Sequence, residues 1–389
     1  MEQRRYDVVL FGATGFTGGL TAEYLARHAP AGCRWALAGR NQRKLETIRA
    51  RLAAINPACA EADLLRADVG DAASLREMAE SAKVVVTTVG PYALYGEPLV
   101  AACAEAGAGY LDLCGEPEFV DETFVRHHER ARQTGARLIH AAGFDSIPYD
   151  LGVFYTLKHL PPDVPISISG QVRSNAMFSG GTYASALTAA SRLGSTVRAA
   201  RARARAEERP AGRKVRAVVG KPHRDPRSGR WLVPMTTIDP QIVARSAALL
   251  PAYGPDFTYR HYASFKRLPT VAVTAAALAA VVLLAQIPPA RKALSSLQKP
   301  GEGPSEERRA RSWFRVRFTA EGGGRRVETE VSGGDPGYGE TAKMLAESAL
   351  CLAFDDLPDT AGQVTTAAAM GDALLARLVD AGLVFRVAA

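Results

Sequence analysis

The sequence has few cysteines, five in 389 residues, and they stand far apart at positions 33, 59, 103, 114 and 351. It contains no C-x-x-C pair and no group of histidines and cysteines at zinc spacing. We therefore expect neither a disulfide framework nor a bound metal. We also expect no apolar leader, because residues 1–7 include four charged residues and run directly into an expected strand. The protein is expected to be cytoplasmic, with membrane association left open.

The composition lacks the extremes that are typical of disordered chains. Apolar residues make up 47% and charged residues 23%, within the range of globular proteins. A chain of 389 residues is long for one compact domain, so two domains are expected.

An acidic balance is absent too, since the net charge is +8. The excess is local, because residues 198–230 hold twelve Arg or Lys residues against three acidic ones. A solvated helix face and loop is the interpretation that we favour. A docking surface for an acidic carrier protein, a lipid head group or a phosphorylated substrate stays open. Nucleic acid is not expected, because the stretch has one aromatic residue at its edge and no recognised reading module.

The first 150 residues alternate between apolar runs typical of buried strands and segments of helical spacing. Such an alternation predicts an α/β fold with a doubly wound parallel sheet, a Rossmann domain over residues 1–150. The expected strands are 6–11, 34–38, 62–67, 84–89, 109–113 and 137–141, and the expected helices are 17–28, 42–54, 72–82, 98–106 and 118–134.

After residue 150 the pattern changes. Residues 164–172 alternate as in an antiparallel strand, and 313–318 with 326–331 predict a hairpin. We expect a second, α+β domain of mixed or antiparallel sheet over 151–338. Residues 339–353 and 365–378 predict two helices within a C-terminal segment, 339–389, that returns to the Rossmann domain.

The longest apolar run, 270–287, contains no charged residue and is flanked by Lys266 and Arg267 before it and Arg291 and Lys292 after it. Its length allows a transmembrane helix, but seven of its eighteen residues are alanine. We favour a buried helix or one that lines a substrate tunnel. A patch on a membrane surface and a true span remain alternatives.

A glycine-rich turn lies between the first expected strand and the first expected helix. Gly12 permits a tight turn, Gly15 lets the backbone approach a pyrophosphate, and Gly18 allows the helix to pack closely on the strand. The strand before the turn and the helix after it supply the context that this motif requires. Its expected cofactor contacts are Gly12, Thr14, Gly15, Phe16, Thr17 and Gly18.

The second expected strand ends in Arg40, where NAD-binding proteins usually carry an acid. Arg40 and Lys44 suit the 2′-phosphate of NADP, which is the cofactor that we predict. Asp68, at the end of the third strand, is placed to meet the adenine, or else to cap the following helix.

The fourth strand leads into Val89, Gly90 and Pro91, which we expect beside the nicotinamide half of the cofactor. Tyr92 and Tyr95 follow, and they are either aromatic residues of a loop or groups that cover the ring or donate a proton.

Polar residues also follow the fifth and sixth strands, at the same carboxyl edge of the expected sheet. Glu116 and Asp145 could orient a substrate or transfer a proton there. Asp145 could equally cap the helix that begins near Pro148. The segment 179–182 (SGGT), before an expected helix over 183–192, offers a second helix N-terminus for an anionic group.

Several of these segments together resemble the saccharopine dehydrogenase-like oxidoreductases, and most closely the actinobacterial branch of trans-acting enoyl reductases. The segments are GATGFTG, LAGR, TTVGPY, DLCGE, GFDSIPYDLG, SGGTYAS, KPGEGPS and AAAMGDALLARL. The resemblance covers nearly the whole chain. It implies an NADPH-dependent enoyl reductase that saturates a carbon–carbon double bond of a polyketide or lipid intermediate, often held on a carrier.

On this basis, Tyr92 or Tyr95 is expected to supply a proton or polarise a carbonyl, while Glu116 and Asp145 shape the site. One alternative is a saccharopine-type dehydrogenase acting on an imine or amino acid. Another is a non-catalytic nucleotide-binding protein of lipid surfaces. Peripheral membrane contact through 270–287 and a homo-oligomer stay open.

Overall fold

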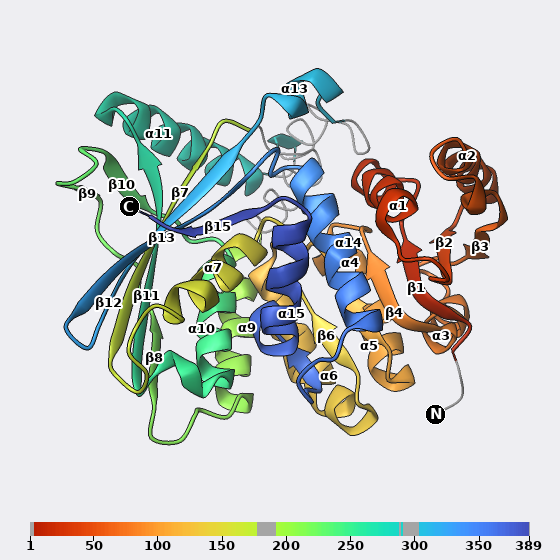
Figure 1. The fold of residues 1–389 in the computed structure, drawn as a ribbon, viewed down its shortest axis with the longest axis horizontal. Helices are drawn as coiled ribbons and strands as arrows, with labels where there is room; N and C mark the ends of the chain where they lie inside the picture. Colours follow the sequence, from red (N-terminus) through yellow and green to blue (C-terminus); the bar gives the residue numbers. More distant parts are fainter. Residues whose placement is uncertain (1–3, 177–191, 288, 291–302, 389) are drawn as a thin grey trace.

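The computed structural model describes residues 4–176, 192–287, 289–290 and 303–388, which form two sheets joined by helices (Figure 1). The first sheet has seven parallel strands in the order β14-β6-β5-β4-β1-β2-β3. This confirms the doubly wound Rossmann sheet. Its strands are β1 (Tyr6–Phe11), β2 (Trp35–Gly39), β3 (Asp63–Arg66), β4 (Ala82–Thr87), β5 (Gly109–Leu111), β6 (Arg137–Ile139) and β14 (Gly362–Val364).

Helices cover both faces of this sheet, because successive residues of its central strand point to opposite sides. On β1, Val8 and Leu10 pack into one core, whereas Val9 and Phe11 pack into another. The first core takes apolar residues from α1 (Phe16–His28), α2 (Gln42–Ala53) and α14 (Gly339–Phe354). The second takes them from α3 (Ala72–Ser81), α5 (Glu97–Ala106) and α6 (Pro117–Thr134).

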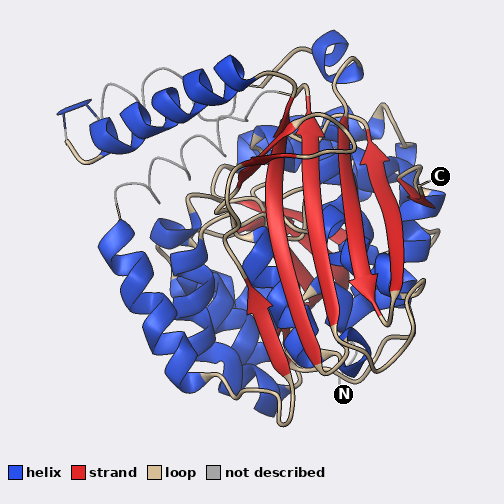
Figure 2. Ribbon diagram, turned by 90° about the vertical axis from the view of Figure 1, so that its left-hand side faces the viewer, coloured by secondary structure: helices blue, strands red, loops and turns tan. Residues whose placement is uncertain are grey.

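The second sheet is mixed, as expected, and its strands run in the order β15-β13-β12-β7-β11-β10-β9, with β8 paired to β11. Only the β7–β11 and β8–β11 pairs recorded in it are parallel. One broad face of the sheet has helices behind it and the other faces outward (Figure 2). The strands are β7 (Ile166–Ser174), β8 (Lys214–Ala217), β9 (His223–Arg224), β10 (Trp231–Pro234), β11 (Asp256–Phe265), β12 (Phe314–Gly322), β13 (Arg325–Gly333) and β15 (Val384–Val387).

The remaining helices connect the two sheets or lie at their edges. They are α4 (Tyr92–Tyr95), α7 (Ile147–Leu157), α9 (Leu193–Ala206), α10 (Asp239–Leu249), α11 (Leu268–Ala285), α13 (Glu306–Ala310) and α15 (Thr366–Asp380), with 3-10 turns at Pro57–Glu61 and Pro251–Tyr253. The glycine turn expected at 179–182 lies outside the described residues, as does the helix expected after it up to residue 191.

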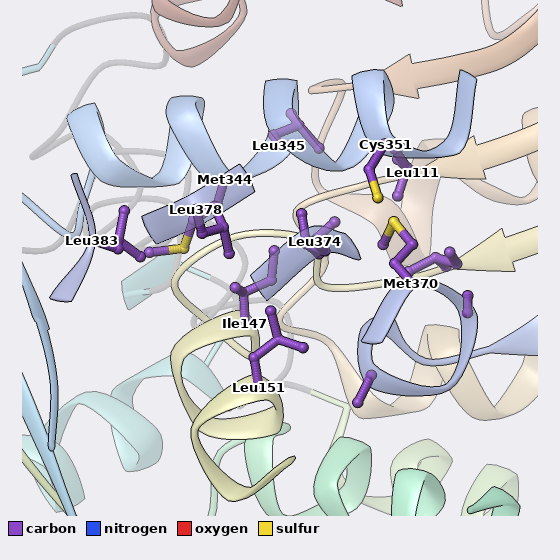
Figure 3. Packing of buried hydrophobic residues seen from close by; sticks show 14 of the residues in the cluster. Leu111, Ile147, Leu151, Met344, Leu345, Cys351, Met370, Leu374, Leu378 and Leu383 are labelled. Atoms are coloured by element: carbon purple, nitrogen blue, oxygen red, sulfur yellow. The ribbon is translucent and has the colours of Figure 1, made fainter. Parts of the chain in front are cut away.

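The C-terminal segment joins both sheets. Strand β14 extends the first sheet beside β6, and β15 extends the second beside β13. Between them, α15 packs its Met370 and Leu374 against α14 and α7 in one continuous core (Figure 3). The buried Asp150 of α7 fixes the start of α15, because its carboxylate accepts hydrogen bonds from the Thr366 hydroxyl at 2.7 Å and the Ala367 N–H at 2.8 Å.

The apolar run does form a helix, α11, but the expectation that it is buried is wrong. Val273 is 70% exposed, Leu283 68% and Ile287 51%. Among the described elements, α11 packs against β10 and β11 at the end of the second sheet. Within the described residues, no helix is long and apolar enough to span a membrane.

Candidate functional site

The glycine turn after β1 has the shape of a dinucleotide cradle. Gly12 adopts a φ of +90°, which side chains rarely allow, and its N–H donates to the Ala38 carbonyl at 3.0 Å. A Cβ on Gly12 would lie 2.8 Å from Thr88 Oγ1. A Cβ on Gly18 would overlap the Gly12 carbonyl oxygen. Glycine is therefore required at position 12 by the positive φ and the nearby end of β4, and at position 18 by the close approach of α1 to the turn.

The first turn of α1 leaves backbone donors open toward this cradle. Gly15 is the N-cap residue and no side chain caps the helix. Thr14 and Gly15 are exposed, while Phe16 and Thr17 are half-buried. Uncapped N–H groups at a helix start suit a pyrophosphate, so these residues fit a dinucleotide.

Phe16 connects the turn to distant parts of the chain. Its ring meets that of Tyr338 edge-on at 4.7 Å, and the Arg309 guanidinium lies 5.5 Å from its centroid. Helix α13 and the residue that precedes α14 therefore border the cradle, which the local motif alone could not predict.

The two cations expected to bind the 2′-phosphate are both available. Arg40 ends the strand at β2 and Lys44 lies in the first turn of α2, and both are exposed. Neither side chain makes an ion pair with a residue that the structure describes. An unpaired guanidinium at this place fits a phosphate.

Asp68 does not cap α3, so that alternative is wrong. Its carboxylate accepts from the Gly70 N–H at 2.9 Å, within the loop after β3. The cap is Asp71, which accepts from the N–H groups of Ala73 and Ser74. A contact of Asp68 with adenine stays a prediction.

The end of β4 touches the glycine turn directly. The Thr88 hydroxyl donates to the Gly12 carbonyl at 3.2 Å, and Val89 and Gly90 continue along the same edge. The Gly90–Pro91 peptide bond is cis. The loop expected beside the nicotinamide thus lies next to the pyrophosphate cradle.

Tyr92 and Glu116 form a buried network behind this loop. The Tyr92 hydroxyl donates to the Thr87 carbonyl and accepts from the Leu113 N–H, both at 3.2 Å. The Glu116 carboxylate accepts from the N–H groups of Tyr92 and Ala93, both at 2.9 Å. Burial raises the pKa of Tyr92 well above its ordinary value. The two residues hold the strand ends together.

Tyr95 is on the surface, with 44% of its area exposed. It belongs to the short helix α4, one turn beyond Tyr92. A catalytic role for Tyr92, Tyr95 or Glu116 stays a prediction.

Asp145 differs from these residues, because its carboxylate makes no hydrogen bond to the described residues. It does not cap α7, whose N-cap residue is Ser146 and which lacks a side-chain cap. A Cβ on Gly115 would lie 3.4 Å from Asp145 Oδ2, so the carboxylate stands over the loop after β5. Burial raises its pKa to about 6. A carboxyl group in this state can remain protonated near neutral pH and act as an acid.

A second group of polar residues near Asp145 is not evident from the sequence. Asp239 and His261 are buried, with Asp239 Oδ2 and His261 Nε2 at 3.8 Å. Tyr149 meets the His261 ring at 4.7 Å, and burial raises the pKa of both Tyr149 and Asp239, helped by the charge of Asp145. These residues come from α7, α10 and β11, so no spacing along the chain connects them.

A hollow of about 550 Å³ also opens on the Rossmann half, but at the opposite edge of the sheet. It is lined by residues such as Cys33, Trp35 and Asp63, at the amino ends of β1 to β3. Ligands of such sheets bind at the carboxyl ends of the strands. This hollow is therefore not the candidate site.

The basic stretch 198–230 is largely tied into the fold. Arg203 is buried and pairs with Asp121 at 3.0 Å. The Arg213 guanidinium donates to four backbone carbonyls around the end of α10. Arg227 pairs with Glu328. The net charge of this stretch therefore overstates what it offers to a partner.

Comparison with known proteins agrees with this geometry. The family model described as the saccharopine dehydrogenase NADP binding domain matches residues 8–139. A protein of Mycobacterium tuberculosis named as a trans-acting enoyl reductase is 40% identical, over 98% of this chain and 97% of its own. The trans-acting enoyl reductase of Mycobacterium ulcerans is 37% identical, with the same coverage. The chain belongs to the trans-acting enoyl reductase family. This membership confirms an NADP(H)-dependent oxidoreductase.

The fold has a counterpart among solved structures. Saccharopine dehydrogenase (L-Glu forming) from Saccharomyces cerevisiae superposes with a TM-score of 0.57 at 11% identity, covering 98% of this chain and 99% of that one. At this identity the likeness shows the shared architecture alone. It confirms the Rossmann sheet with a second mixed sheet.

Proposed function

We propose that this protein reduces a carbon–carbon double bond conjugated to a carbonyl, in a lipid or polyketide intermediate. Family membership supports the class of reaction. The observation that carries the chemistry is Asp145, a carboxyl group of raised pKa without a hydrogen-bond partner among the described residues, at the edge where the cofactor site opens.

The reaction needs a hydride, an acid and a group that polarises the carbonyl. The glycine turn and Arg40 would hold NADPH, which would supply a hydride for the β-carbon of the alkene. Asp145 gives its proton to the α-carbon, and its pKa of about 6 keeps part of it protonated near neutral pH. The glycine turn and Arg40 bind the pyrophosphate and the 2′-phosphate.

Tyr92 and Glu116 act by position in this scheme. Their hydrogen bonds fix the loop 88–93 against the end of β5. A tyrosine whose hydroxyl already joins two backbone groups is a poor proton donor to a substrate. Tyr95, which lies in α4 just after this loop, is exposed, so we assign to it the contact with the substrate's carbonyl.

The experiment is a substrate panel followed by the change in NADPH absorbance. With NADPH we expect turnover of a branched enoyl thioester or an enoyl lipid, and none of 2-oxoglutarate plus lysine. With NADP⁺ we expect no turnover of saccharopine, whose oxidation would form NADPH. Turnover with the amino-acid substrates alone would instead establish the saccharopine-type alternative. Binding of NADPH without turnover of any substrate would support a non-catalytic role.

Asp145→Asn tests the acid, with Asp356→Asn as the matched control. Asp356 is exposed and far along the chain, before β14. We expect Asp145→Asn to lower kcat by about a hundredfold or more, while NADPH still binds. Equal kcat in the two variants would remove Asp145 from the mechanism.

We further propose that the substrate is presented on a carrier. The exposed cations of α9, Arg198 and Arg201, support an acidic partner. We expect a lower KM for the carrier-bound enoyl group than for the free thioester. Arg201→Glu should reduce the difference between these two KM values.

A further inference from the structure

Helix α11 consists almost entirely of apolar residues, and several of its large side chains are exposed to solvent. It lies along the end of the second sheet, on the side away from α1 and α2 (Figures 1 and 2). From residue 268 to 287 no charged residue occurs. Its exposed large residues are Leu268, Val273, Leu283, Leu284 and Ile287, with exposed fractions from 41% to 70%. Exposed apolar surface of this kind is typical of a site that contacts a protein or a membrane.

A rim of cations and tryptophans surrounds the point where α11 leaves the sheet. Lys266 and Arg267 begin the helix, and both are exposed. The sheet register places Phe265 beside Trp231, and Trp231 beside Arg224. The same end of the sheet therefore carries basic and aromatic residues on several neighbouring strands.

The rim continues across the next strands. Arg173 of β7 pairs in register with Arg315 of β12, and its guanidinium lies 5.6 Å from the ring centroid of Trp313. Burial lowers the pKa of Arg173, and the positive charges of Arg230, Arg315 and Arg317 lower it further. Positively charged side chains therefore outnumber negatively charged ones at this end of the sheet.

The acids near this rim are already engaged. The Glu330 carboxylate is shared by Arg315, Arg317 and Arg386. Asp225 accepts from the Ser228 N–H and hydroxyl. Lys266 and Arg267 make no ion pair with any residue in the described part of the chain. The rim therefore presents net positive charge beside an apolar helix.

We propose that α11 and its rim dock this protein on an anionic lipid bilayer, with the helix lying in the interface. Apolar side chains would enter the boundary between head groups and acyl chains, while lysine and arginine meet anionic head groups. Trp231 and Trp313 belong to the residue type that gathers at this depth. Docking would bring the site to a lipid substrate, but the inference does not depend on the proposed reaction.

Charge argues against a second copy of this chain as the occupant. A dimer that packs α11 on α11 would cover the apolar residues, but it would supply no negative charge to either rim, because the second copy carries the same basic residues. An anionic bilayer complements the rim.

The test is co-sedimentation with vesicles of phosphatidylcholine alone or mixed with phosphatidylglycerol. Each basic residue near an anionic surface contributes about a fivefold gain in partitioning. We expect strong binding to the mixed vesicles, weak binding to the neutral ones, and a decrease with added salt. Equal binding to both vesicles, or binding to neither, would overturn the proposal.

Three variants locate the contact. Val273→Asp with Leu283→Asp removes the apolar contact, and Lys266→Glu with Arg267→Glu reverses two charges of the rim. Each pair should lower partitioning at least tenfold. Val379→Asp on α15 is the control, because Val379 is 47% exposed but lies on another helix, and it should bind as the unchanged protein does.

Two further readouts separate the possible outcomes. Bromine-labelled lipid should quench tryptophan fluorescence on binding, which a merely electrostatic contact at the head groups would not cause. Mass measurement in solution should show that the aspartate pair leaves the oligomeric state unchanged; dissociation of a dimer would instead make a second copy the occupant. NADPH affinity, unchanged in these variants, keeps a failure here distinct from a failure of the proposed reaction.

Discussion

Gly18 and Gly19 are neighbours on α1, and alanine at these two positions should have opposite effects. At Gly18 the added Cβ would overlap the Gly12 carbonyl oxygen and lie 2.8 Å from Thr88 Oγ1, both parts of the cofactor cradle. At Gly19 it would lie 2.8 Å from the end of the Arg51 side chain. A backbone carbonyl in a tight turn cannot withdraw, whereas a half-exposed guanidinium can.

The expected magnitudes follow from this difference. Alanine in place of glycine inside a helix gains up to about 1 kcal/mol. Gly19→Ala should retain most of this gain, because the Arg51–Glu23 ion pair that it disturbs is partly exposed and contributes little. Gly18→Ala meets an overpacking cost of about 1–3 kcal/mol and displaces the turn. We expect a net loss of stability of up to about 2 kcal/mol and NADPH binding at least about tenfold weaker.

Urea unfolding and a titration of NADPH fluorescence measure both quantities. Gly19→Ala should unfold at an equal or higher urea concentration and bind NADPH as the unchanged protein does. If Gly18→Ala matches Gly19→Ala in both assays, α1 does not approach the turn as closely as described, and the cradle is misplaced.

Three other perturbations have defined outcomes. Arg40→Ala should weaken NADPH binding about tenfold or more and leave NADH binding unchanged, as measured by titration with each. The pKa of Asp145, about 6 in the fold, lies above its ordinary value of 3.8, so the stability that this group contributes is present below pH 4 and lost as the pH rises through about 6. Asp145→Asn should therefore raise the free energy of unfolding, measured with urea, by about 3 kcal/mol at pH 7 and by little at pH 4. A stabilisation that does not depend on pH would contradict this. In the unchanged protein, kcat/KM should fall above pH 6. Arg203→Ala, which leaves Asp121 buried without its cation, should cost about 3–5 kcal/mol, whereas Arg201→Ala on the exposed face of the same helix should change stability by less than about 0.5 kcal/mol.

The parts predicted from the sequence are those that local patterns determine. The glycine turn, the strand before it and the helix after it are continuous in the chain, so their arrangement follows from steric rules for glycine and from apolar spacing. Strand β14, of three residues, was not expected. Its segment is too short to show periodicity, and only its pairing with β6 makes it a strand.

Residues 270–287 show that composition does not determine whether an apolar helix is buried or exposed. An uncharged apolar run indicates that these residues are removed from water. Burial in a core, lining of a tunnel and contact with a bilayer would each remove them from water. The choice depends on whether other elements cover the helix. Here α11 follows the end of β11 and packs on β10 and β11, and its side chains Val273 and Leu283 remain exposed.

The carboxylates at the carboxyl edge of the first sheet show why residue type and position alone do not identify a catalytic group. Asp112 and Asp145 follow adjacent strands. Asp112 accepts hydrogen bonds from the Tyr110 hydroxyl, the Cys114 and Ala141 N–H groups and the His140 ring, at 2.7 to 2.9 Å. Asp145 receives none from the described residues, and burial raises its pKa to about 6.

A carboxylate that accepts from four donors is held in one orientation, because those donors would lose their partner if it turned away. A carboxyl group that accepts from none of the described residues is free to turn toward a ligand. The same chemical group is therefore structural at the end of β5 and a candidate acid at the end of β6. The number of hydrogen bonds that the fold directs at each one makes the difference, and this number is fixed only when distant parts of the chain come together.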